Sequence, residues 1–195
     1  MNTLLTRHCV ALLATCLVAA CSSAPEPVLY TLEPSLTGRD SQRDGPRISL
    51  AEVELPAYAR SNLIASADGP NKIRLDDDHR WASVPSESIT SALAQQLEAA
   101  LDGTVLVQPH PRRFRPTLAI RVNFDRLLRT ERGAAELSGR AIISVDASES
   151  IEIVRFAVVG AATGADYAAY MASVQAALEE IASRIADRVT SLPAT

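Results

Sequence analysis

The stretch "LAIRVNFD", residues 118–125, has the most regular alternation of apolar and polar side chains in the sequence. The apolar positions are Leu118, Ile120, Val122 and Phe124. Successive side chains of a β-strand point to opposite faces of a sheet. The stretch therefore predicts a strand with one face buried in a core and the other facing solvent.

Several shorter runs on either side of this stretch also have β character. They lie at residues 28–32, 48–50, 53–55, 62–66, 72–75, 104–107, 137–145 and 151–159. The apolar phase slips by one residue at Ala51 and Glu52, which predicts a β-bulge. The composition of residues 68–71, Asp-Gly-Pro-Asn, is typical of a hairpin turn.

Two segments change to a helical period. Apolar residues recur every four positions from Ile89 to Leu101, after Pro85 and before Asp102-Gly103. A longer stripe with steps of three and four runs over residues 171–192. The order of these segments predicts a single α/β domain, with a mixed, largely antiparallel sheet covered by two main amphipathic helices.

Residues 1–20 have the features of an exported signal peptide rather than of a domain. An apolar run of about half the length needed to span a membrane follows Arg7. Val18-Ala19-Ala20-Cys21 resembles the lipobox of bacterial lipoproteins, in which the cysteine becomes the acylated first residue. The alternative is an ordinary secreted protein cleaved after Ala20, with an incidental cysteine.

The cysteine pattern favours lipidation. All three cysteines lie at positions 9, 16 and 21, so removal of residues 1–20 leaves Cys21 with no disulfide partner. Two or more acyl chains make membrane attachment stable. We therefore expect an acylated tether over residues 21–27, which contains Pro25 and Pro27, and a globular domain over residues 28–195.

No residue pattern indicates an enzyme, a metal site or a cofactor. The sequence lacks a nucleophile elbow, a metal-binding helix, a P-loop and a dinucleotide fingerprint. Residues 76–79, Asp-Asp-Asp-His, are the one group of possible metal ligands, and we interpret them as a solvated turn between a strand and the first helix. The net charge of −4 gives no indication of a nucleic-acid partner.

A basic loop is a candidate for binding. Its guanidiniums, Arg112, Arg113 and Arg115, lie among three prolines. They could engage lipid phosphates or the carboxylates of a partner protein, or they could simply be solvated.

Two longer stretches resemble a known family. They are "ISLAEVELPAYARSNLIAS", residues 48–66, and "NKIRLDDDHRWASVPSESITSALAQQL", residues 71–97. Together with the lipobox, with Tyr30-Thr31-Leu32, with Leu55-Pro56-Ala57-Tyr58 and with Trp81-Ala82, they resemble the PqiC-like family of ABC-type transport auxiliary lipoproteins. One departure is that Ala59 and Arg60 stand where the family often has leucine.

The resemblance implies a non-catalytic accessory role in envelope lipid transport that supports membrane integrity. The implied partners are a periplasmic MCE-domain protein and an inner-membrane permease or integral partner, and a ring-shaped homo-oligomer is compatible with the family. Ser22 after the acylated cysteine favours the outer membrane, with the domain facing the periplasm.

Three further residues are candidates for partner binding in this interpretation, namely Pro56, Tyr58 and Trp81. Trp81 fits a place in the core beneath the helix at least as well. Two other functions remain open: a lipoprotein that activates a cell-wall synthase or supports a secretion assembly, and a small hydrolase with a dispersed site.

Overall fold

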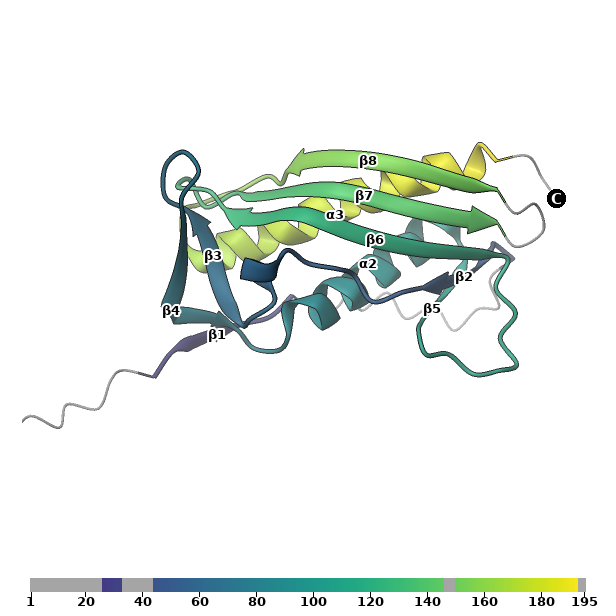
Figure 1. Cartoon of the computed structure of the whole chain (residues 1–195), viewed down its shortest axis with the longest axis horizontal. Helices are drawn as coiled ribbons and strands as arrows, with labels where there is room; N and C mark the ends of the chain where they lie inside the picture. Colours follow the sequence, from purple (N-terminus) through teal and green to yellow (C-terminus); the bar gives the residue numbers. More distant parts are fainter. Residues whose placement is uncertain (1–25, 33–43, 146–149, 193–195) are drawn as a thin grey trace, which may run out of the picture.

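The computed structural model describes residues 26–32, 44–145 and 150–192. Within these residues, eight strands form one sheet and two α-helices lie against one of its faces (Figure 1). The strands are β1 Val28–Tyr30, β2 Arg47–Leu50, β3 Leu63–Ala67, β4 Ile73–Trp81, β5 Thr104–Val107, β6 Leu118–Arg129, β7 Ala135–Val145 and β8 Ile151–Val159. The helices are α2 Pro85–Leu101 and α3 Tyr167–Thr190. The predicted α/β class and single domain are confirmed.

Strand β6, which contains the alternating residues 118–125, is the centre of the sheet. Along one edge it pairs with β7 from Leu118 to Arg129. Its other edge is shared, because β2 pairs with its first residues and β3 reaches it at Arg129. The sheet therefore forks on this side, with β5 outside β2 at one end, and β4 and β1 outside β3 at the other.

The sheet is mixed, as predicted, and its longest ladders are antiparallel. Antiparallel pairs join β6 to β7, β7 to β8 and β3 to β4. The parallel pairs, β1 with β4, β2 with β5, β2 with β6 and β3 with β6, are all short.

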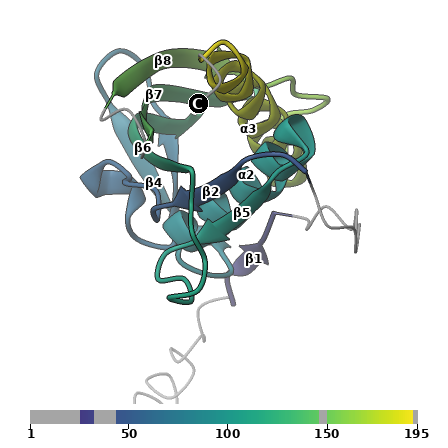
Figure 2. The same ribbon diagram turned by 90° about the vertical axis from the view of Figure 1, so that its right-hand side faces the viewer.

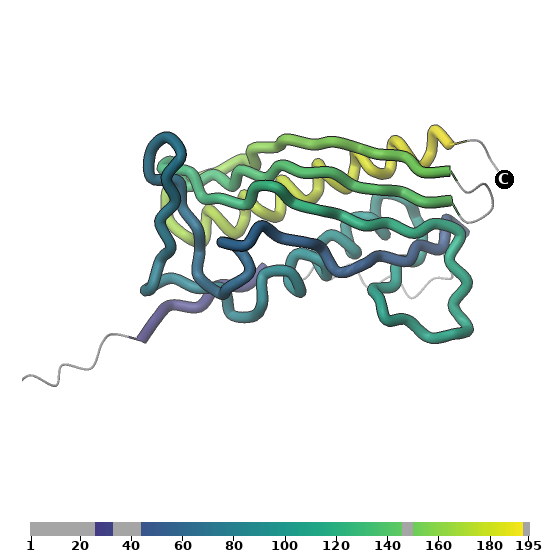
Figure 3. Tube along the Cα trace, viewed as in Figure 1, coloured from purple at the N-terminus to yellow at the C-terminus, as the bar shows by residue number. Residues whose placement is uncertain are grey.

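The predicted bulge after β2 is present, although residues 53–55 do not form a full strand. Leu50 pairs with Ile120, whereas Glu54 forms an isolated bridge with Asn123. One extra residue on the β2 side therefore lies between these two pairs, which explains the slip in apolar phase. The chain then runs on beside β6 to the short 3-10 helix Ala57–Ala59 (Figure 3).

The segment Asp76–His79 lies inside β4, and not in a turn before α2 as predicted. Leu63 pairs with Arg80 but Ile64 pairs with Asp76, so residues 77–79 have no partner on β3. The Asp76 carboxylate accepts hydrogen bonds from the backbone N–H groups of Asp78 and His79. These two hydrogen bonds to the Asp76 side chain account for the turn-like composition of a segment that stays within the strand.

The core lies between the sheet and the two helices, around which the sheet curves (Figure 2). Helix α2 begins at Pro85 and is followed by Asp102 in the left-handed conformation, with φ of 46°. Helix α3 is capped by the Asp166 carboxylate, which accepts from the N–H of Ala169. The apolar stripe predicted for the last helix is buried, with Leu178, Ile181 and Ile185 fully inaccessible.

Candidate docking surface

The loop at residues 108–117, between β5 and β6, presents the three arginines that the sequence analysis singled out. Arg112, Arg113 and Arg115 are all exposed. The Arg115 guanidinium donates to the backbone oxygen of Arg112. Within the described part of the chain, no carboxylate forms an ion pair with any of the three.

Contacts with β2 hold the base of this arginine loop in place. The Ser49 hydroxyl is hydrogen bonded to His110 at 3.0 Å and accepts from the Gln108 side-chain amide at 2.9 Å. The ring of Phe114 lies edge-on to His110, with centroids 5.1 Å apart. The positive charges are thus displayed on a loop whose base is fixed to the sheet.

The arginine loop and the entry of the chain lie at opposite ends of the domain. The loop runs into Leu118, the first residue of β6, whereas β1 is joined through β4 and β3 to Arg129, the last residue of β6. Strand β6 has 12 residues and therefore spans roughly 40 Å. Figure 1 shows β1 at the lower left and the loop at the lower right.

Pro56 and Tyr58 lie apart from the arginine loop. Tyr58 is half-buried, and its hydroxyl accepts a hydrogen bond from the backbone N–H of Leu127. Pro56 precedes the 3-10 helix and is partly exposed. Leu127 is close to the Arg129 end of β6, so the structure does not join these two residues to the arginines in one surface.

Trp81 is a core residue. Its side chain is 2% exposed and packs edge-on against the ring of Tyr170 from α3. A buried indole is not accessible to another protein, so Trp81 is not a candidate for partner binding. Cys21, the expected lipidation site, lies outside the described residues.

A cluster that the sequence analysis did not predict surrounds Tyr167 at the start of α3. Its ring stacks on His79, with centroids 3.9 Å apart, and the Arg129 guanidinium lies 4.5 Å from its centroid. Its hydroxyl donates to the Asp76 carboxylate, and Tyr30 of β1 is hydrogen bonded to His79 at 3.1 Å. The cluster connects β1, β4, β6 and α3.

The electrostatics of this cluster favour a neutral tyrosine beside a charged carboxylate. Burial is the main cause that raises the pKa of Tyr167 to about 12, and the hydrogen bond to Asp76 adds to it. Partial burial acts to raise the pKa of Asp76, but hydrogen bonds from Tyr167, Asp78 and His79 outweigh it and keep that pKa below its ordinary value.

A groove of about 380 Å³ lies beside the end of β1 and one side of α2. Its lining consists of Thr31, Leu32, Ser83, Glu87, Ser88, Ser91, Ala92 and Gln95. Glu87 is the one ionisable side chain among these lining residues. The hydroxyls of Ser83 and Ser88 are hydrogen bonded to each other. Elsewhere in the described ranges, no three His, Cys, Asp or Glu side chains gather as a metal site.

Comparison with known proteins identifies the family. Residues 30–186 match the family described as the ABC-type transport auxiliary lipoprotein component. The chain belongs to this family. Its members are described as auxiliary to transport, which fits a non-catalytic component attached to a membrane of the cell envelope. No helix in the described residues is long and apolar enough to cross a membrane.

Two solved structures share the fold. One is a crystal structure of an uncharacterized protein, with a TM-score of 0.70 and 14% identity over 85% of this chain and 99% of that chain. The other is protein XCC0632 from Xanthomonas campestris, a DUF330 protein, with a TM-score of 0.62 and 15% identity over 84% of this chain and 92% of that chain. No curated protein matches the chain.

Proposed function

We propose that this lipoprotein is a docking subunit of an MCE-type lipid transport system, anchored in the outer membrane through acylated Cys21 and facing the periplasm. In this proposal the domain has no catalytic role. It holds the end of a periplasmic MCE-domain protein, which in turn works with an inner-membrane permease or integral partner. In this proposal several copies of the domain form a ring around the docked protein.

The observation that carries the proposal is the position of the arginine loop relative to the chain entry. Residues 22–27 separate the anchor from β1 and span at most about 20 Å. The arginine loop lies roughly 40 Å further along the domain. Its three exposed guanidiniums, which form no ion pair with a carboxylate of the described residues, are therefore placed to meet carboxylates of a protein that arrives from the opposite membrane, and less well placed to bind phosphates of the anchoring bilayer.

Tethering supplies the mechanism. Confinement of the domain to the membrane surface raises its effective concentration near any partner that reaches that surface. Exposed guanidiniums add electrostatic steering, which increases the rate of association more than the final affinity. Neither step requires a catalytic group.

A capture experiment with charge-reversed variants tests the proposal. The full chain is used to pull down its cognate MCE-domain protein, either unchanged or with Arg112→Glu and Arg113→Glu. We expect the double variant to lose most of the capture, with the loss larger at low salt because exposed charges are screened at high salt. The matched control is Arg74→Glu with Arg132→Glu, the same change in charge on exposed residues near the chain entry.

Two outcomes would contradict the proposal. One is equal capture by the two double variants, which would remove the arginine loop from the interface. The other is no capture by the folded, membrane-attached wild-type chain, which would remove the MCE-domain partner.

A further inference from the structure

Strand β8 is an edge strand of the sheet, and no other strand of the described residues pairs with its outer edge. It pairs with β7 alone. The bonds from the N–H of Val145 to Ser150 and from the N–H of Gly160 to Ala135 set the phase of this ladder. The alternate residues between them therefore direct their backbone N–H and C=O groups away from β7. These residues are Ile151, Ile153, Arg155, Ala157 and Val159.

This edge lacks several of the features that usually prevent a free edge from pairing with another strand, although it carries Arg155 on its outer face and Glu152 on its inner face. Residues 151–159 contain no proline and no lysine, and their register with β7 is continuous. On the outer face the strand is mainly apolar, with Ile151, Ile153 and Val159 at 65%, 53% and 64% exposure. An exposed apolar edge of this kind is a template for strand addition.

A pair of facing arginines indicates the charge of the missing neighbour. Arg155 lies directly opposite Arg140 of β7 on the outer face. The two form a pair without mutual backbone hydrogen bonds, in which side chains are closest and like charges destabilise. In the described chain, neither guanidinium forms an ion pair.

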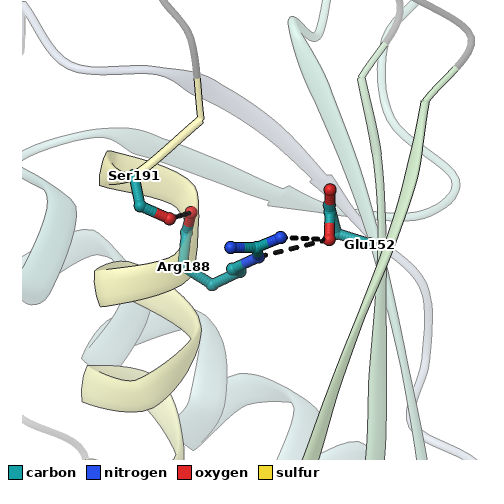
Figure 4. Close-up of polar contacts among 3 residues, drawn as sticks. All are labelled: Glu152, Arg188 and Ser191. Atoms are coloured by element: carbon teal, nitrogen blue, oxygen red, sulfur yellow. Dashed lines mark hydrogen bonds and ion pairs between the residues drawn. The ribbon is translucent and has the colours of Figure 1, made fainter.

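The carboxylates of Glu54 and Glu152 are engaged elsewhere. Glu54, in the same row beyond Asn123, accepts a hydrogen bond from the Asn123 amide. Glu152 of β8 lies on the inner face, where Arg188 of α3 donates to it at 2.5 Å (Figure 4). Glu152 therefore lies on the face opposite to Arg155 and is already paired with Arg188 of α3, so it does not compensate Arg155.

We propose that the free edge of β8 is a strand-addition site for an extended segment of another protein, with an acidic residue flanked at alternate positions by β-branched apolar residues. The backbone of that segment satisfies the outward N–H and C=O groups of β8. Its acidic side chain lies opposite Arg155, and its apolar side chains lie beside Ile153 and Ala157. The proposal is independent of the arginine loop and of the MCE-domain partner.

A second copy of this chain fits the edge less well. Antiparallel pairing of two β8 strands about Arg155 would place the two Arg155 side chains opposite each other. A shift by two residues would still gather four arginines from the two copies, with no carboxylate between them. The charge pattern therefore favours an acidic segment of a different protein.

A peptide-binding experiment on the full chain, purified in detergent, tests the proposal. The probe is the fluorescent peptide Thr-Thr-Val-Thr-Glu-Thr-Val-Thr-Thr, and binding is followed by fluorescence anisotropy. We expect binding to the wild type, about tenfold weaker binding when lysine replaces the central glutamate, and no binding when alternate peptide nitrogens are methylated. The methyl groups stand on the nitrogens of the two valines and the glutamate, so this peptide keeps its side chains but loses the N–H donors that face β8, and the methyl groups also obstruct close approach to the edge.

Variants of the chain test the same edge from the other side. Ala157→Pro removes an N–H that β7 does not use, so we expect a folded protein that no longer binds, whereas Ala157→Thr keeps binding. Arg155→Glu should reverse the preference and select the lysine peptide, which gives a test that does not depend on proline being tolerated.

Binding of the methylated peptide as tightly as the parent would overturn the proposal, and so would the absence of any binding by the wild type. Self-association of the wild type that Ala157→Pro abolishes would also overturn it, because the edge would then belong to a second copy.

Discussion

At the scale of single residues, Tyr167 combines a ring stack, a cation–π contact and a hydrogen bond. The Tyr167 ring contacts the imidazole of His79 and the guanidinium of Arg129, and its hydroxyl donates a hydrogen bond to the carboxylate of Asp76. Its partners Asp76, His79 and Arg129 come from two different strands. Loss of this side chain would loosen β1, because Tyr30 is held through His79.

We expect Tyr167→Phe to reduce stability and to change its dependence on alkaline pH. Loss of the hydrogen bond to Asp76 should lower the free energy of unfolding by about 1 kcal/mol at neutral pH. Because folding raises the pKa of Tyr167 to about 12, the unfolded chain loses this proton first, and the wild type should lose stability as the pH rises from about 10 towards 12. Urea unfolding at pH 7, 10 and 11 would measure both effects.

The variant should lose less stability than the wild type over that alkaline range. Some loss will remain, since burial also raises the pKa of Tyr170. Equal alkaline loss in both proteins would show that Tyr167 is not held as described.

Most of the residue-scale detail could not be predicted from the sequence. Tyr167 and Asp76 are 91 positions apart, and no local pattern reports such a contact. The position of Trp81 just before a helix is compatible with a place in the core or in an interface. Only the position of α3, whose Tyr170 packs against Trp81, shows that it lies in the core. The exposure of the arginine loop was predictable, because three prolines exclude a regular element around its charges.

At the scale of elements, periodicity predicted the two helices and most strands within a few residues. It could not predict the fork beside β6, because parallel pairing of β2 with β5 and β6 joins segments far apart in the chain. The bulge after β2 was predictable, since one extra residue moves every later side chain to the other face.

The contact between the end of β8 and α3 depends on a glycine. A Cβ added at Gly160 would lie 1.9 Å from the carbonyl oxygen of Ser173, while the Ser173 hydroxyl accepts from the N–H of Ala135. Gly160 therefore lies in close packing between the sheet and α3.

We expect Gly160→Ala to lower the free energy of unfolding by about 2 kcal/mol, because the added carbon must push α3 away from the end of β8. Gly164→Ala is the matched control, since its Cβ would lie no closer than 3.6 Å to any other atom. Chemical denaturation of both variants would compare them. A similar loss at both positions would contradict the close packing at Gly160.

At the scale of the whole molecule, the domain has two distinct ends. The chain enters beside β4 at one end, and the arginine loop, the start of β6 and the end of α3 lie at the other (Figures 1 and 2). Attachment through the N-terminal side would therefore orient the arginine loop away from the anchoring membrane.

Single labels on the acylated chain in vesicles would measure this orientation. A donor dye at Asp78→Cys, beside the entry point, should transfer energy efficiently to an acceptor lipid. A dye at Arg113→Cys should transfer several-fold less, because it lies roughly 40 Å further from the bilayer. Cys21→Ser should abolish vesicle attachment and both signals, and equal transfer from the two labels would contradict the orientation.

The parallel pairing of β1 with β4 also determines how the domain bears tension. Its three residues are aligned with the neighbouring strand, and the backbone oxygen of Tyr30 accepts from the N–H of Ala82 at 2.7 Å. With the proposed anchor at Cys21, a pull on the chain acts along β1 and loads these bonds in shear, so they must rupture together instead of opening one after another. Mechanical force on the entry of the chain is therefore resisted first at the sheet edge that carries Tyr30, which passes the load to β4 through this pairing and to α3 through the contact between the Tyr30 and Tyr167 rings.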